Sequence, residues 1–118
     1  MNLKDIVKEF NLEVVSSSDN LDREVTGGYV SDLMSDVMAN SKSGDIWITL
    51  QIHQNIVAVA SLKDIVGIVV IGGRKVEEET IEKAETENIP ILATELPAFE
   101  IVGKLYELGI GREDEDEK

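Results

Sequence analysis

Three short apolar runs constrain the fold of this chain more than any other feature of its sequence. They are Ile46–Leu50, Val66–Ile71 and Ile89–Ala93, and they begin roughly 20 residues apart, a short but sufficient spacing for strand–helix units. None of the runs alternates polar with apolar residues, so each predicts a strand that is buried on both faces. Strands that alternate with helices indicate a parallel sheet with right-handed crossovers.

The segments that follow these runs have the pattern of amphipathic helices. Helices are predicted at about His53–Leu62, Val76–Glu87 and Pro97–Leu108. The polar face of the second is rich in glutamate, which suits a surface in water. The apolar positions form three stripes that should face the sheet: Ile52, Ile56, Val59 and Ala60; Ile81 and Ala84; Ile101, Leu105 and Leu108.

The first forty residues add shorter elements. Leu3–Phe10 predicts a helix with Asn2 as its N-cap, and Leu12–Val15 predicts a strand. Next come an expected surface loop (Ser16–Asn20), a brief extended segment (Glu24–Thr26) and a short helix (Asp32–Asn40). The predicted fold is a single α/β domain, with a mainly parallel sheet from three βα units, an N-terminal helix and short β elements. It should occupy residues 1–110, and the acidic residues 111–118 are expected to be a disordered tail.

The charge balance narrows the possible partners. The chain carries 24 acidic and 11 basic residues, a net charge of −13. Nucleic-acid polymers and anionic membranes repel such a chain, so neither is an expected partner. The absence of cysteine excludes disulfides and thiolate metal sites, and no apolar run is long enough to span a membrane. We therefore expect a cytoplasmic protein without a metal or other cofactor.

One polar stretch, Asp22 to Asp32, goes beyond what folding alone requires. It combines an acid–base pair, a threonine, the double glycine Gly27-Gly28 and a tyrosine. In one interpretation it is a local anchor, in which Asp22 and Arg23 form structural ion pairs and Asp32 caps a helix. In the other it is a binding loop, in which the glycines let the backbone approach a ligand or another chain.

Further polar residues follow the predicted strands, where open parallel sheets bind ligands. With hydroxyls, two cations and free backbone N–H groups, that edge would suit a phosphate or carboxylate. Simpler roles stay open: the threonines could cap helices, the glycines could form a turn with positive φ, and the only histidine could be structural. The candidate ligand-binding residues of both regions are Asp22, Arg23, Thr26, Gly27, Gly28, Tyr29, Asp32, Thr49, His53, Asn55, Gly72, Gly73 and Thr94.

Known catalytic patterns are missing from the sequence. There is no G-x-S-x-G elbow and no thiol nucleophile, and Gly72-Gly73-Arg74-Lys75 lacks the spacing of a Walker loop. A carboxylate pair of Asp22 and Asp32 stays possible, but an enzyme is the least expected class of protein.

The same residues resemble a known family, the DRTGG domain. Asp22, Arg23, Thr26, Gly27 and Gly28 supply its pattern in order, with Glu24-Val25 between. The similarity runs from about Leu12 to Leu108, and it includes Gly44–Thr49, His53–Ile56 and Ile89–Thr94. The family is similar to the N-terminal domain of HPr kinase/phosphorylase and to the middle domain of some phosphate acetyltransferases, and it also occurs beside CBS domains.

The resemblance implies a non-catalytic regulatory or interaction module that forms homodimers. Because the chain has no P-loop kinase domain, it implies no kinase activity. Our main hypothesis is a homodimeric module that senses a small anionic metabolite or nucleotide near Thr26–Tyr29, Thr49 and Thr94. The alternative is a protein–protein interaction module without a small-molecule ligand.

Overall fold

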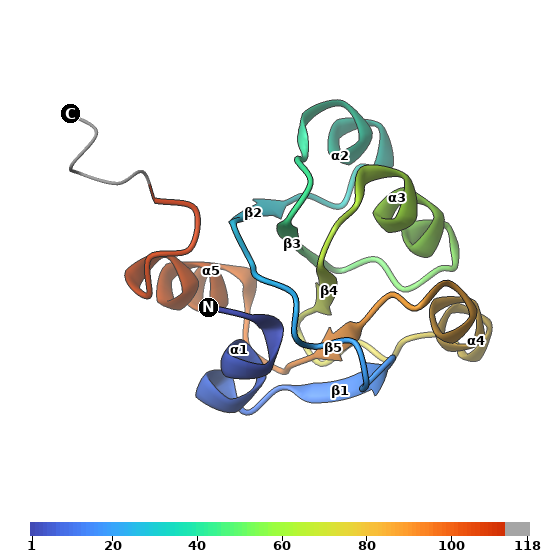
Figure 1. Cartoon of the computed structure of the whole chain (residues 1–118). Coiled ribbons are helices and arrows are strands. Elements are labelled where there is room, and N and C mark those ends of the chain that lie inside the picture. Colours follow the sequence, from blue (N-terminus) through green and yellow to red (C-terminus); the bar gives the residue numbers. More distant parts are fainter. Residues whose placement is uncertain (113–118) are drawn as a thin grey trace.

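The computed structural model describes residues 1–112; the end of the acidic tail, 113–118, lies outside the described residues. The chain forms one α/β domain of five helices and five strands within that range (Figure 1). In chain order they are α1 (Leu3–Phe10), β1 (Glu13–Ser16), β2 (Gly27–Val30), α2 (Met34–Asn40), β3 (Asp45–Thr49), α3 (Asn55–Lys63), β4 (Gly67–Val70), α4 (Glu78–Glu87), β5 (Ile91–Ala93) and α5 (Ala98–Glu107).

The strands form one sheet in the order β1-β5-β4-β3-β2. All neighbouring pairs are parallel except β1 and β5, which are antiparallel. The three predicted βα units are therefore confirmed, and they form the central part of the sheet. The strand β2, which carries the double glycine, lies at one edge.

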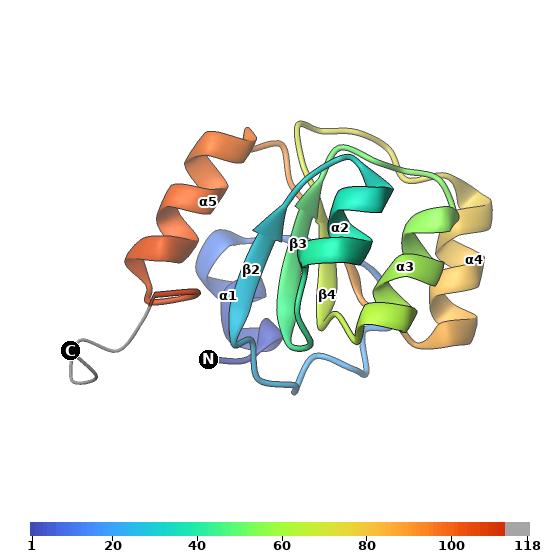
Figure 2. The same cartoon turned by 90° about the horizontal axis from the view of Figure 1, so that it is seen from above.

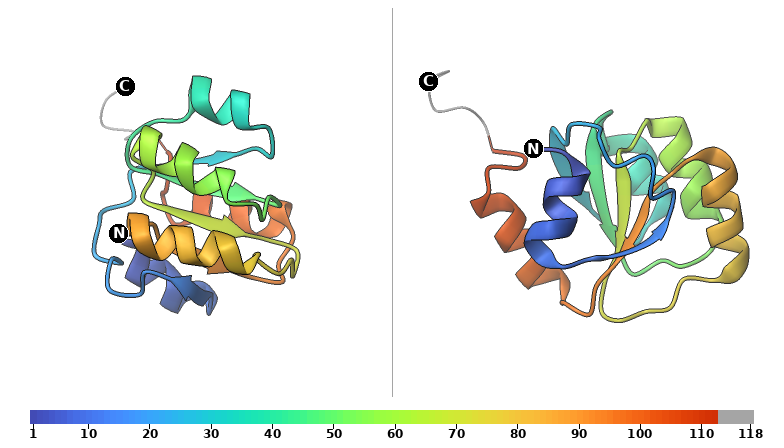
Figure 3. Two further views of the ribbon diagram at one scale, coloured as in Figure 1. Left: turned by 90° about the vertical axis from the view of Figure 1, so that its right-hand side faces the viewer. Right: turned by 60° about the horizontal axis from the view of Figure 1, so that its bottom comes forward.

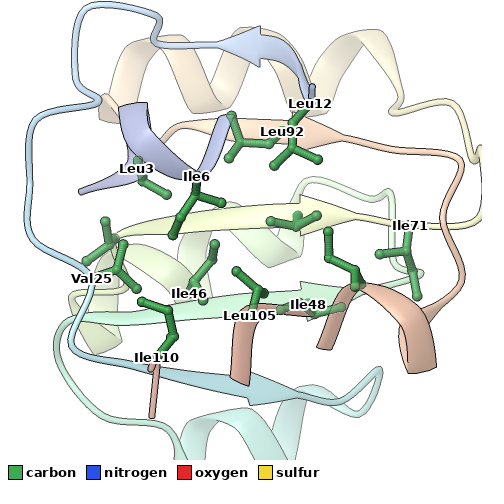
Figure 4. Close-up of a cluster of buried hydrophobic side chains, with 13 residues drawn as sticks. Leu3, Ile6, Leu12, Val25, Ile46, Ile48, Ile71, Leu92, Leu105 and Ile110 are labelled. Atoms are coloured by element: carbon green, nitrogen blue, oxygen red, sulfur yellow. The ribbon is translucent and has the colours of Figure 1, made fainter. Parts of the chain in front are cut away.

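Helices cover both faces of the sheet (Figures 2 and 3). Helices α1 and α5 pack on one face, and α2, α3 and α4 pack on the other. Neighbouring strand residues alternate between two cores. In β3, for example, Ile46 and Ile48 belong to the α1–α5 core shown in Figure 4, whereas Trp47 belongs to the opposite core. Burial of both faces explains why these strands show no polar alternation.

The N-terminal helix begins as the sequence predicts. The side chain of Asn2 accepts a hydrogen bond from the Asp5 N–H, and Asp5 returns one from the Asn2 N–H, which is a capping box. Leu3 and Ile6 are fully buried under this helix. The predicted stripes of the later helices are largely confirmed, but Leu108 is 38% exposed because α5 ends one residue before it.

One local prediction was wrong, and a second was incomplete. Ser16–Asn20 is not simply a surface loop: Ser16 ends β1, and its buried hydroxyl donates to the Ile89 carbonyl and accepts from the Ile91 N–H. The expected extended segment at Glu24–Thr26 contains only an isolated bridge to Asn2, and the strand itself begins later, at Gly27. In both places, pairing with a distant segment decides the local conformation.

Within residues 1–112, no helix combines the length and apolar character needed to cross a membrane. In the same part of the chain, no three His, Asp or Glu side chains are grouped as metal ligands.

Candidate functional site

The candidate residues lie at opposite ends of the sheet. Gly27 pairs with Asp45 at the amino end of β3, whereas Thr49 ends that strand. At about 3.3 Å per residue, the two ends are about 13 Å apart. Our expectation that Thr26–Tyr29 would converge with Thr49 and Thr94 at one edge was therefore wrong. Parallel pairing of β2 with β3 puts the start of β2 at the opposite end.

At the amino end, Arg23 acts as an anchor. Its guanidinium contacts both carboxylate oxygens of Asp64, at 3.0 and 3.2 Å, and the Ser43 hydroxyl donates to the same carboxylate. Asp64 ends α3, so the motif is tied to the loop before β4. The neighbouring Asp22 is exposed and forms no ion pair within residues 1–112. The expected structural ion pair thus exists, but it joins Arg23 to Asp64.

The same contacts set a pH dependence. The hydroxyl of Ser43, followed by the guanidinium of Arg23, lowers the pKa of Asp64 below its usual value. Because the folded-state pKa is the lower one, this stabilisation is complete above the usual carboxyl pKa of about 4 and is lost as the pH falls through the folded value. We expect the stability difference between wild type and Asp64→Asn to shrink as the pH is lowered from 7 to 3, as measured by urea unfolding.

The substitution suits this test because asparagine also accepts the left-handed backbone found at Asp64, with φ of 54°. Asp22→Asn is the control, since Asp22 is exposed and unpaired in the described part of the chain. A difference for Asp64→Asn that stays constant over this pH range would contradict the assignment.

The double glycine lies in a strand, which corrects the expected binding loop. Gly27 and Gly28 are the first two residues of β2. A Cβ added at Gly27 would lie 2.7 Å from Asp45 Oδ1, so the absence of a side chain lets this buried carboxylate sit against the strand. Asp45 in turn accepts a hydrogen bond from the Lys42 N–H at 2.8 Å. Part of the motif therefore serves a close approach within the chain.

A polar groove of about 460 Å³ opens beside this motif. It contains two exposed cations, Lys42 and Arg112, against one buried carboxylate, Asp45. The groove is lined by Thr26, Gly27, Gly28, Tyr29, Asn40, Lys42, Ser43, Asp45, Gly111 and Arg112. Four of the sequence candidates, Thr26 to Tyr29, are thus brought together with residues from the α2–β3 loop and the end of the chain described here.

Sequence reasoning missed the basic part of this groove. Lys42 lies just beyond the predicted helix Asp32–Asn40, where no function was expected, and Arg112 lies in the predicted tail. Lys42 comes to lie beside the motif because β2 pairs with β3, and Arg112 does so because the segment after α5 returns to β2. Gly111 lies beside the Gly28 N–H, so that return is close.

Tyr29 links the groove to α2. Its hydroxyl donates to Asp36 Oδ1 at 2.6 Å, and the Asn40 amide donates to the same oxygen at 2.8 Å. The hydrogen bond raises the pKa of Tyr29 and lowers the pKa of Asp36. Tyr29 is therefore a protonated donor held by an ionised carboxylate, and its hydroxyl has a structural partner.

At the carboxyl end, Asp32 and Thr49 are joined by a hydrogen bond, and neither is the N-cap residue of α2 or α3. Asp32 Oδ1 accepts from the Thr49 hydroxyl at 2.8 Å and from the Leu50 N–H at 2.7 Å. Thr49 Oγ1 also accepts from the Gln51 N–H, four residues before α3 begins. The predicted cap at Asp32 was wrong because α2 starts at Met34, with Leu33 as its N-cap residue.

The expected free N–H groups of Gly72 and Gly73 are already used. Both residues have positive φ, as a tight turn requires, but their N–H groups donate to the carbonyls of Leu96 and Thr94, at 3.1 and 3.0 Å. Thr94 Oγ1 accepts from the Leu96 N–H. Both N–H groups therefore have backbone partners and are not free to donate to an anion.

The remaining candidates at this end are exposed. His53 Nδ1 lies 2.9 Å from a Glu77 carboxylate oxygen, and Asn55 is the first residue of α3. The nearby pocket, about 380 Å³, has Glu13 and Glu95 among its lining residues and one cation, Arg74. Arg74 donates to the Leu50 carbonyl. Of the two, the amino-end groove therefore has the more basic lining.

Comparison with known proteins settles the family. The family model of the DRTGG domain matches residues 5–108. The chain belongs to the DRTGG domain family. The match covers the motif and all three βα units, so the resemblance inferred from Asp22–Gly28 is confirmed. No curated protein matches the chain.

A solved structure shares the fold of this DRTGG domain. It is the crystal structure of the CBS and DRTGG domains of the regulatory region of Clostridium perfringens pyrophosphatase, in complex with the activator diadenosine tetraphosphate. The TM-score is 0.68 and the sequence identity 21%; the match covers 86% of this chain and 44% of that one. The DRTGG domain thus spans less than half of a larger regulatory region in that protein.

Proposed function

We propose that this DRTGG domain is a non-catalytic regulatory module that binds a small anionic metabolite or nucleotide in the amino-end groove and acts as a homodimer. The main support is the groove itself, where the motif residues Thr26–Tyr29 meet two cations, Lys42 and Arg112. Support for the ligand class comes from the related regulatory region, which was solved with a dinucleotide activator. The acidic, cysteine-free composition supports a cytoplasmic location.

The electrostatics make the two cations necessary. With a net charge of −13, the chain as a whole repels an anion at long range. An anion can therefore bind only where basic side chains outnumber acidic ones locally. Lys42 and Arg112 outnumber the single carboxylate of the groove, and the hydroxyl of Thr26 adds a donor. Nucleotide phosphates are ligands of this kind, because they pair with cations and accept several hydrogen bonds.

The groove predicts an effect of Lys42→Ala on ligand affinity. Removing one exposed charge-assisted contact of about 1 kcal/mol should weaken binding roughly fivefold. Isothermal titration calorimetry with diadenosine tetraphosphate, ATP, acetyl phosphate and coenzyme A would measure it. The matched control is Lys75→Ala, an exposed lysine at the opposite end of the sheet.

The control also separates the two ends of the sheet. If Lys75→Ala weakens binding and Lys42→Ala does not, the site lies at the carboxyl end. A ligand at 100 times its Kd should add about 2.7 kcal/mol of stability. If none of the four compounds raises the unfolding temperature at millimolar concentration, the small-molecule function is contradicted.

A protein–protein interaction module is the second candidate. The observation that favours it is an apolar surface on α5, where Phe99 is 94% exposed. It predicts that the wild-type domain binds none of the four compounds, and that Lys42→Ala leaves association and partner binding unchanged.

A further inference from the structure

An apolar surface groove of about 810 Å³ is lined by residues of the edge strand β2 and helix α5. Figures 1 and 2 show these two elements at the same side of the domain. We call this surface the β2–α5 face; it is lined by Val30, Ala98, Phe99, Val102, Gly103, Tyr106 and Glu107. Phe99 is 94% exposed, Tyr106 58% and Val30 48%. Single exposed apolar residues are ordinary, but a contiguous group with two aromatic rings is typical of an interaction surface.

The placement of the aromatic residues strengthens this point. The whole chain has only five aromatic side chains, and two of them, Phe99 and Tyr106, lie on this face. The other three pack in the two cores of the domain. Trp47 and Tyr29 pack in the core between the sheet and helices α2, α3 and α4, and Phe10 packs against the α1–α5 core. Aromatic residues are the commonest anchors of protein interfaces because they bury a large area with few rotatable bonds.

The charges of the described residues around this face are balanced. They belong to Glu100 and Glu107 on α5, to Lys104, which pairs with Glu100 at 3.1 Å, and to Arg112, whose guanidinium lies 5.7 Å from the Tyr106 ring. Within residues 1–112, these two acids and two bases carry no net charge. Helix α4, by contrast, carries five glutamates and one lysine. A second, equally acidic copy of the chain would be repelled at α4 but not here.

We propose that the β2–α5 face is the surface through which two copies of this chain associate. This inference rests on the homodimer of the proposed function and names the face that forms it. In a two-fold interface each copy presents the same patch, so Phe99 and Tyr106 of one protomer would meet the apolar groove of its partner. The mixed rim is self-complementary, because the acids of one copy can face Lys104 or Arg112 of the other.

The amino-end polar groove and the β2–α5 face are separate surfaces, and both include residues of the strand β2. Gly28 and Tyr29 line the polar groove, and the next residue, Val30, lines the β2–α5 face. Arg112 lines the groove and contacts the Tyr106 ring. Association could thus influence the ligand site through β2 and Arg112, although the two properties can be measured independently.

The test is Phe99→Asp, examined by sedimentation equilibrium over a wide range of protein concentrations. The substitution buries a charge in the interface and should raise the dimer dissociation constant at least tenfold. Because Phe99 is exposed in the monomer, the circular dichroism spectrum of the variant should match that of the wild type. Its unfolding midpoint should also match at concentrations low enough for both proteins to be monomeric. The matched control is Leu62→Asp, which puts the same charge on a 74% exposed residue of α3 and should leave association unchanged.

A second variant, Lys104→Glu, tests the rim. It turns a neutral rim into one with a net negative charge in each copy, and it should weaken the dimer in a way that salt partly reverses. If Phe99→Asp and Leu62→Asp associate equally well, this face is overturned while the homodimer stands. A wild-type chain that stays monomeric up to millimolar concentration overturns the homodimer and this face together. Ligand titration of Phe99→Asp reports on the groove separately in either case.

Discussion

Gly44→Ala is expected to destabilise the domain by about 2–4 kcal/mol, because it combines backbone strain with a steric overlap. Gly44 has φ of 89°, a region that residues with a side chain rarely adopt. An added Cβ would also overlap the Oγ1 atom of Thr26. The Thr26 N–H donates to the Gly44 carbonyl at 3.0 Å, so the two segments cannot separate without losing this bond. Chemical unfolding followed by circular dichroism would measure the loss.

A double-mutant cycle separates the two causes. Thr26→Ala removes the overlapping oxygen and should recover the steric part of the loss, which leaves the strain of about 1–2 kcal/mol from positive φ. The matched glycine control is Gly103→Ala, in the middle of α5, where an added Cβ meets nothing within 4 Å. It should be neutral or stabilise the helix by up to about 1 kcal/mol. Equal effects at Gly44 and Gly103 would contradict this account.

Trp47→Ala is expected to cost about 3–5 kcal/mol, since it leaves a large cavity in the core between the sheet and α2–α4. Trp47 is fully buried in the inner strand β3, and its indole N–H donates to the Ser31 carbonyl at 2.8 Å. The bond holds the segment that leaves β2, so the substitution should loosen both the core and the turn at Asp32. Unfolding by urea, followed by circular dichroism, provides the measurement.

Trp47→Phe is the graded control. Phenylalanine keeps most of the buried ring but cannot donate to Ser31, so the expected loss is roughly 1–2 kcal/mol. If Trp47→Ala and Trp47→Phe are equally destabilised, the hydrogen bond dominates and the packing argument fails. If neither loses stability, the position of the indole at the centre of this core is contradicted.

The βα units were predictable because their information is local. Short unbroken apolar runs such as Val66–Ile71, alternating with amphipathic segments, indicate strands buried on both faces, and α4 and α5 show their apolar stripes in sequence. The Asn2 cap was equally local, since donor and acceptor lie three residues apart. The motif Asp22–Gly28 is likewise linear, so the sequence alone identifies the family.

The double glycine shows the opposite case. Glycine is unfavourable in strands, so Gly27-Gly28 carries no local signal that a strand begins there. In the structure, parallel pairing with β3 supplies the hydrogen-bonding partner, and the buried carboxylate of Asp45 fills the space that a side chain would have occupied. The interaction joins residues from different strands, so the sequence around Gly27 does not predict it.

The sequence by itself determined the α/β class, the three βα units, the family and the acidic surface, because these follow from local periodicity, a linear motif and composition. Only the tertiary structure decided where the polar residues meet. In the folded chain, the N–H groups of Gly72 and Gly73 donate hydrogen bonds within the turn, and Arg23 pairs with Asp64. Lys42 and Arg112 lie beside Thr26 in the amino-end groove. These contacts join segments tens of residues apart, and their geometry depends on strand order and register, which no local pattern specifies.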